Sequence, residues 1–132
     1  MYVTSYFGAN WSQSQSFYTD VDRFLDFLFD EEFPKANERA KSYGHTSGTY
    51  YVRIYKNENR GEIHFEYWKY DEQWREEIPS DIGKDYDIDF ESWDEKKEFL
   101  DKILEKLKEH SDKFEYHYEE DDERIKITVW LR

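Results

Sequence analysis

Residues 85–95 read DYDIDFESWDE, a stretch in which acidic side chains alternate with apolar ones before a helix begins. If residues 85–91 are extended, side chains two positions apart share a face and lie about 6.6 Å from one another. One face then carries a row of four carboxylates: Asp85, Asp87, Asp89 and Glu91. This spacing is comparable with that of phosphates in DNA, which carries one charge per about 3.4 Å of each strand. The stretch contains no basic residue, so we expect it to bind a cationic partner.

A helix is predicted directly after this row. Ser92 and Glu95 have the spacing of a capping box, in which each side chain bonds a free backbone N–H at the helix start. Apolar residues then recur at helical intervals as far as about Lys108, at Phe99, Leu100, Ile103, Leu104 and Leu107. These residues predict an amphipathic helix with one buried face.

An earlier helix is predicted from an N-cap at Thr19 to about Phe33, because Pro34 disfavours helical geometry in the residue before it. A further short helical turn is expected over Lys35–Ser42. Before these, Met1–Phe7 has the alternation of a strand, and Gly8–Ser16 is expected to be a polar loop.

Two β-hairpins are predicted from alternating apolar residues. The first spans residues 49–70 and is expected to pair Tyr50 with Tyr67, Val52 with Phe65 and Ile54 with Ile63. The second joins residues 113–118 to residues 124–131 and is expected to pair Phe114 with Val129, Tyr116 with Ile127 and Tyr118 with Ile125. Residues 71–90 either add a strand or form a loop, and the sequence leaves both open.

These elements predict an α+β fold with one domain over residues 1–132. We expect a mostly antiparallel sheet of four to six strands, built from the two hairpins and the N-terminal strand. Two main helices are expected to pack on one face of the sheet, which leaves the other face in contact with solvent.

The composition favours an acidic protein that folds without crosslinks. The net charge is −13 and the pI is about 4.7, which disfavours nucleic acid and anionic membranes as direct partners. A mean hydropathy of −1.16 is typical of disordered chains, but aromatic residues make up 20% of the sequence and can supply a core. The absence of cysteine and of a leader-like N-terminus suits a cytoplasmic protein.

The acidic row does not match a calcium-binding loop. Asp85, Asp87 and Asp89 have the spacing of an EF-hand, but Phe90 replaces the required glycine and Lys96 replaces the required glutamate. A nucleophile elbow, a Walker loop and a dinucleotide-binding glycine motif are also absent. We therefore expect a non-enzymatic protein without a cofactor.

The histidines offer a weaker indication of a site. His117 shares a strand face with Glu115 and Glu119, but the neighbouring Lys126 opposes a metal ion there. No metal is expected. An enzyme or ligand-binding site formed around His64 and His117 stays open as an alternative function.

Aromatic residues on the predicted outer sheet face indicate an interface, because Tyr and Trp are enriched in protein interfaces. The alternative is that residues 71–90 cover these rings as a second layer. The predicted partner-binding set combines the rings with the acidic residues: Asp85, Asp87, Asp89, Glu91, Asp94, Tyr51, Tyr55, Trp68 and Trp74.

The leading hypothesis is a non-catalytic inhibitor that blocks a basic, nucleic-acid-handling protein such as a nuclease. Two settings fit this chemistry: an immunity protein that neutralises a nuclease toxin, and a phage anti-defence, anti-CRISPR or DNA-mimic protein. A small scaffold subunit, whose acidity provides solubility, is a further alternative. The sequence leaves the oligomeric state open.

Overall fold

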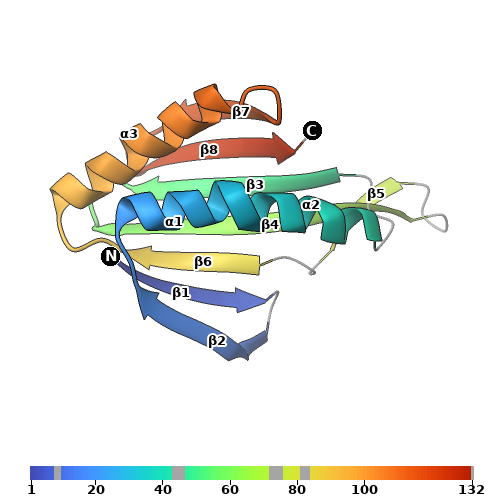
Figure 1. The fold of residues 1–132 in the computed structure, drawn as a ribbon, viewed down its shortest axis with the longest axis horizontal. Helices are drawn as coiled ribbons and strands as arrows, with labels where there is room; N and C mark the ends of the chain where they lie inside the picture. Colours follow the sequence, from blue (N-terminus) through green and yellow to red (C-terminus); the bar gives the residue numbers. More distant parts are fainter. Residues whose placement is uncertain (8–9, 43–46, 72–75, 81–83, 132) are drawn as a thin grey trace.

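The computed structural model describes residues 1–7, 10–42, 47–71, 76–80 and 84–131, which form one antiparallel sheet with helices on one face (Figure 1). The strands are β1 (Tyr2–Phe7), β2 (Asn10–Tyr18), β3 (Ser47–Tyr55), β4 (Arg60–Asp71), β5 (Glu76–Ser80), β6 (Lys84–Asp89), β7 (Phe114–Glu120) and β8 (Arg124–Leu131). The helices are α1 (Val21–Phe27), the π-helical η1 (Leu28–Glu32), α2 (Phe33–Ser42) and α3 (Trp93–Glu109).

The predicted α+β architecture is confirmed, with more strands than expected. Seven strands follow one another in the order β2-β1-β6-β4-β3-β8-β7, and β5 pairs with β4 beside this path. Because β5 and β6 lie in the same sheet as β3 and β4, residues 76–80 and 84–89 form strands and no second layer. Within the described ranges, no helix is both long and apolar enough to cross a membrane.

The loop predicted over Gly8–Ser16 is wrong, because Asn10–Tyr18 forms the edge strand β2. Its pairing with β1 begins at Met1 and Thr19, whose backbones exchange hydrogen bonds of 2.9 and 3.0 Å. The Ser/Gln sequence of β2 has no apolar alternation that could have indicated a strand. Backbone hydrogen bonds to β1 hold this segment extended.

Both hairpin registers differ by two residues from the prediction. In β3–β4, Val52 pairs with Ile63 and Ile54 with Gly61; in β7–β8, Tyr116 pairs with Val129. A two-residue shift keeps every side chain on its own face, so the apolar pattern fits either register. In the observed register Ile54 lies opposite Gly61, where a Cβ would lie 3.2 Å from the ring of Phe90, so this position favours glycine.

The first helix does not end before Pro34, as the sequence predicted, but continues as η1 and α2 (Figure 1). A proline ring in an α-helix collides with the carbonyl four residues earlier, here that of Asp30. The π-helical turn immediately precedes the proline, and in it the Phe33 N–H bonds the Leu28 carbonyl five residues back. This wider turn accommodates the proline. The N-cap is Asp20 and not Thr19, because the Asp20 carboxylate accepts from the Arg23 N–H at 2.8 Å.

The core lies between the helices and one face of the sheet. Helix α3 begins at the predicted cap, where Ser92 Oγ accepts from the Glu95 N–H at 3.1 Å. Aromatic rings join the layers: Phe33 meets Tyr50 with ring centroids 4.5 Å apart, and Phe24 meets Tyr86 at 5.6 Å. Fully buried apolar side chains complete the core, among them Val3, Leu25, Leu28, Ile88, Phe99, Ile103, Leu107, Ile127 and Val129. No helix of the described residues covers the opposite sheet face, which is available to position a site.

Candidate functional site

The predicted row of carboxylates lies on this open face of the sheet. Tyr86 and Ile88 of β6 are buried, so Asp85, Asp87 and Asp89 point to the other side. Their strand is not at an edge, because β1 flanks it on one side and β4 on the other. The carboxylates therefore have neighbours on both flanks, and each one differs in what it contacts.

Asp85 is bound within the sheet and is 13% exposed. Its carboxylate accepts from the Phe65 N–H at 3.0 Å and lies 2.8 Å from His64 Nδ1. It does so at the point where β4 changes partner, because β6 pairs with residues 60–63 of β4 and β5 pairs with residues 67–71. The Asp85 side chain thus provides an acceptor where the strand ladder is interrupted.

His64 is the hydrogen-bond partner of this carboxylate. Its Nε2 lies 3.1 Å from Glu66, so both ring nitrogens face carboxylates. The hydrogen bond with Asp85 raises the pKa of His64 above its ordinary value, an effect that partial burial opposes and Glu66 reinforces. Asp85 and His64 together link β6 to β4, which is a structural role.

Asp87 lies in the most repulsive position of the row. Burial raises the pKa of its carboxyl, and the charges of Glu62, Asp85 and Asp89 raise it further. Glu62 pairs with Asp87 across the β4–β6 ladder and is itself held by Arg60 at 2.6 Å. Like charges gathered in this way cost stability in the free protein and favour the approach of a cation.

The outer-face tyrosines of β3 contact neighbouring side chains and are only partly exposed. The ring of Tyr51 stacks on that of His64 with centroids 6.2 Å apart, and Tyr55 donates to Glu62 at 2.7 Å while Arg60 lies 4.7 Å above its ring. The second layer proposed as their cover is wrong, because residues 76–80 and 84–89 are strands of the same sheet.

The predicted partner-binding set also includes two tryptophans, Trp68 and Trp74, whose side chains lie outside the described part of the structure. Trp68 lies in β4 opposite Ser47 and Pro79, but its side chain is outside the described part of the structure. Trp74 lies outside the described residues altogether.

A larger group of acidic residues belongs to the segments at one end of the molecule, the end where Figure 1 shows the N-terminus and the start of α3. The β3–β4 turn meets the β7–β8 turn here, because the Lys56 N–H donates to the Glu123 carbonyl at 2.9 Å. The β6–α3 connection joins them, since the Phe90 N–H donates to Asn59 at 2.8 Å. We call this surface the acidic end, and define it by Glu58, Asp89, Glu91, Asp94, Glu120, Asp121, Asp122 and Glu123.

Basic side chains neutralise little of the acidic end. Lys56 pairs with Glu120 at 2.8 Å, and the N-terminal amine lies 3.9 Å from Glu91. Within the described residues, Glu58, Asp89, Asp94 and Asp122 have no ion pair; no structural contact fixes these four carboxylates, so they are open to an external cation.

An exposed tryptophan lies between two of these acids in the sequence, Glu91 and Asp94, at the start of α3. Trp93, the first residue of α3, is 55% exposed, and Lys96 Nζ lies against one face of its ring, 3.5 Å from the ring centre. Lys96 is itself held by three backbone carbonyls of the β3–β4 turn, those of Tyr55, Lys56 and Glu58, at 2.9, 3.2 and 2.9 Å. The acidic end thus carries a large ring supported from beneath, which is the character of an interface anchor.

The structure therefore divides the predicted partner-binding set. It brings Asp89, Glu91 and Asp94 together at the acidic end, and it places Asp85 and Tyr51 further along the open face in contacts with His64. The predicted partner-binding set did not include Trp93, although Trp93 lies within residues 85–95, between Ser92 and Asp94. It also treated residues 119–123 only as a turn, because nothing in the sequence indicates that two distant turns meet.

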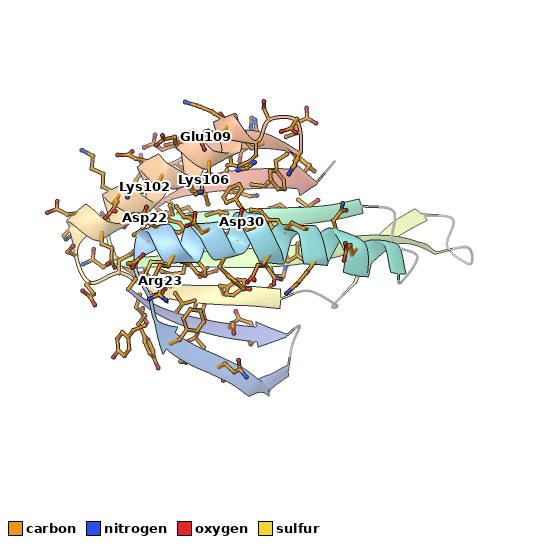
Figure 2. The ribbon with its side chains drawn as sticks, in the orientation of Figure 1. Asp22, Arg23, Asp30, Lys102, Lys106 and Glu109 are labelled. Atoms are coloured by element: carbon orange, nitrogen blue, oxygen red, sulfur yellow. The ribbon has the colours of Figure 1, made fainter. Side chains whose placement is uncertain are left out.

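The helical layer carries acids of a different kind. Lys102 of α3 bonds Asp22 of α1 at 2.7 Å and Glu98 at 2.8 Å, and Lys106 pairs with Asp26 at 3.0 Å (Figure 2). The pairs with Asp22 and Asp26 connect α1 to α3. Because Lys102 and Lys106 already pair with three of its carboxylates, this layer is a weaker candidate than the acidic end.

The two histidines of the alternative site lie far apart. His64 is on β4 and His117 on β7, with β3 and β8 between them, which is about 14 Å at the usual strand spacing. His117 is exposed and lies 3.1 Å from Glu119, which pairs with Lys126 across the ladder. Among the described residues, no group of three His, Cys, Asp or Glu side chains could hold a metal ion.

Comparison of the chain with protein-family models, with curated proteins and with solved structures gives no match.

Proposed function

We propose that this chain is a non-catalytic inhibitor that binds and blocks a basic, nucleic-acid-handling protein through its acidic end. The observation that carries the proposal is the gathering of carboxylates without ion pairs around the exposed Trp93. Acidic residues from three separate segments meet there: the β3–β4 turn, the β6–α3 connection and the β7–β8 turn. Backbone hydrogen bonds hold the second and third of these segments to the β3–β4 turn.

Charge and ring have separate tasks in such an interface. Carboxylates on an acidic protein accelerate the encounter with a basic surface and disfavour acidic partners. A buried aromatic anchor slows dissociation, because it excludes water at the centre of the contact. Trp93 is suited to this task, since the cation beneath it, Lys96, is fixed by three carbonyls before any partner binds.

A nucleic-acid site is the basic surface that fits best. Such a site neutralises phosphates spaced a few ångströms apart with Lys and Arg, and closely spaced carboxylates can occupy the same positions. The biological setting would be an immunity protein against a nuclease toxin or a phage anti-defence protein, in either case acting in the cytoplasm.

The test is affinity capture of a partner from a nuclease-treated native lysate, followed by an activity assay of the captured protein. We compare the double variant Asp89→Lys/Glu91→Lys with the control Asp101→Lys/Glu105→Lys. Both changes add the same charge, but Asp101 and Glu105 are exposed on α3 away from the acidic end.

We expect one basic nucleic-acid enzyme to be captured at low salt, released at high salt and inhibited by the unmodified chain. The first variant should bind it at least about tenfold more weakly, and the control should bind as the unmodified chain does. Equal capture by both variants would point to acids that serve solubility only. Capture of no basic enzyme would refute the proposal.

A further inference from the structure

The N-terminal hairpin differs in charge from the rest of the molecule. Charged residues make up 39% of the chain, yet the first charged side chain is Asp20, after the end of β2. The hairpin formed by β1 and β2 is therefore uncharged apart from the terminal amine. Figure 1 shows β2 at the border of the sheet, away from the helices.

One side of β2 has no neighbouring strand in the described structure. Its residues from Ser14 to Tyr18 are exposed in succession, without the alternation that a covered strand has. Tyr18 is 80% exposed and Phe17 is 38% exposed, on opposite faces of the strand. A partner that pairs with this border would therefore bury apolar rings on both faces.

The direction of the free hydrogen-bonding groups follows from the pairing with β1. Met1 and Thr19 exchange two hydrogen bonds, so they form a hydrogen-bonded pair of an antiparallel ladder. Along the ladder such pairs alternate with pairs whose two residues do not bond one another. The backbone N–H and C=O groups of these other pairs point away from the partner strand. Phe17, opposite Val3, then bonds β1, and the backbone groups of Ser16 and Tyr18 point outward.

The opposite border of the sheet is protected. Strand β7 carries Glu115, Glu119 and Glu120 and leads into the acidic β7–β8 turn. Charged side chains are a common protection against strand pairing at an edge, and β2 has none. We therefore expect the β2 edge, and not the β7 edge, to pair with a further strand.

We propose that β2 pairs with the β2 strand of a second copy of this chain, antiparallel across a two-fold axis, to form a continuous sheet. Two copies that each carry a charge of −13 repel one another, and the uncharged hairpin is where they can approach at least cost. In a two-fold contact the uncharged β2 strands of the two copies lie against one another, and Ser and Gln side chains such as those of residues 14–16 can both donate and accept hydrogen bonds. The charged β7 borders then stop further addition, so the assembly closes as a dimer. This inference is independent of the proposed inhibitor function.

The test is the mass in solution, measured by light scattering during gel filtration, together with backbone amide exchange followed by NMR. We expect a mass of twice 16.4 kDa and slow exchange of the Ser16 and Tyr18 amides, which becomes fast when dilution separates the copies. A mass of 16.4 kDa at the highest concentration would overturn the proposal. Fast exchange of these two amides in a dimer would do so too, because the copies would then meet elsewhere.

Two substitutions of Ser16 distinguish the contribution of its backbone N–H to dimerisation from that of its side chain. Ser16→Pro removes the outward N–H from both copies, whereas Ser16→Ala keeps it and removes only the hydroxyl contact with Thr4 at 2.9 Å. We expect the proline variant to raise the dimer dissociation constant at least about tenfold, and the alanine variant to leave it nearly unchanged. Equal dimerisation by both variants would refute pairing through this border.

Discussion

Replacing Asp85 by alanine removes the carboxylate that links β6 to β4. The Phe65 N–H loses its acceptor, which we expect to cost about 1–2 kcal/mol at a partly buried position. The bond to His64 adds about 1 kcal/mol, a value reduced for solvent screening because that side chain is 38% exposed. Unfolding by heat or urea should therefore show a loss of about 2–3 kcal/mol, or about 6–15 °C in Tm for a domain of 132 residues.

The loss should depend on pH in a defined direction. Since Asp85 is the main cause of the raised pKa of His64, their pairing contributes stability that is complete below the unfolded pKa near 6.5. That contribution disappears as the pH rises through the higher folded pKa. The difference in unfolding free energy between the native chain and Asp85→Ala should therefore be larger at pH 6 than in alkaline solution.

The matched control is Asp87→Ala on the same strand and face. Burial and the nearby carboxylates raise the pKa of Asp87, so its charge opposes folding at neutral pH. Removing it should leave stability unchanged or raise it by up to about 1 kcal/mol. Equal destabilisation by both substitutions, or a cost for Asp85→Ala that does not vary with pH, would refute the assigned roles.

Two further substitutions test the supports of the site. Lys96→Met should lower the unfolding free energy by about 3 kcal/mol, because three turn carbonyls lose a charged donor; unchanged chemical denaturation would contradict this. Gly61→Ala should cost about 1–3 kcal/mol in the same assay, since the added Cβ would lie 3.2 Å from both the Arg53 carbonyl and the Phe90 ring. Stability equal to that of the native chain would mean that the β4 backbone shifts freely.

The faces of the elements could be predicted from the sequence, because side-chain direction follows directly from strand and helix periods. Alternation at Tyr50, Val52 and Ile54 placed them in the core, and the apolar spacing after Ser92 located α3. The same rule placed Asp85, Asp87 and Asp89 together on the open face. Each of these inferences needed only local geometry.

Which of those acids are free could not be predicted in this way. Asp85 and Asp89 are equivalent in the sequence pattern, yet one is bonded within the sheet and the other lies at the acidic end. The difference arises where β4 changes its partner from β6 to β5, because Asp85 there bonds His64 and Phe65, which lie 21 and 20 residues earlier in the chain. Likewise, the acids of residues 120–123 join the site only because two turns meet.

The sequence by itself therefore determined the fold class, the buried faces, the net charge and the absence of charged side chains before Asp20. The tertiary structure alone decided the registers, the strand β2, the helix through Pro34 and the composition of the acidic end. The physical reason is the range of the interactions. Periodicity and capping act within a few residues, whereas register and strand order depend on packing and backbone hydrogen bonds between distant segments, which several pairings of one apolar pattern can satisfy.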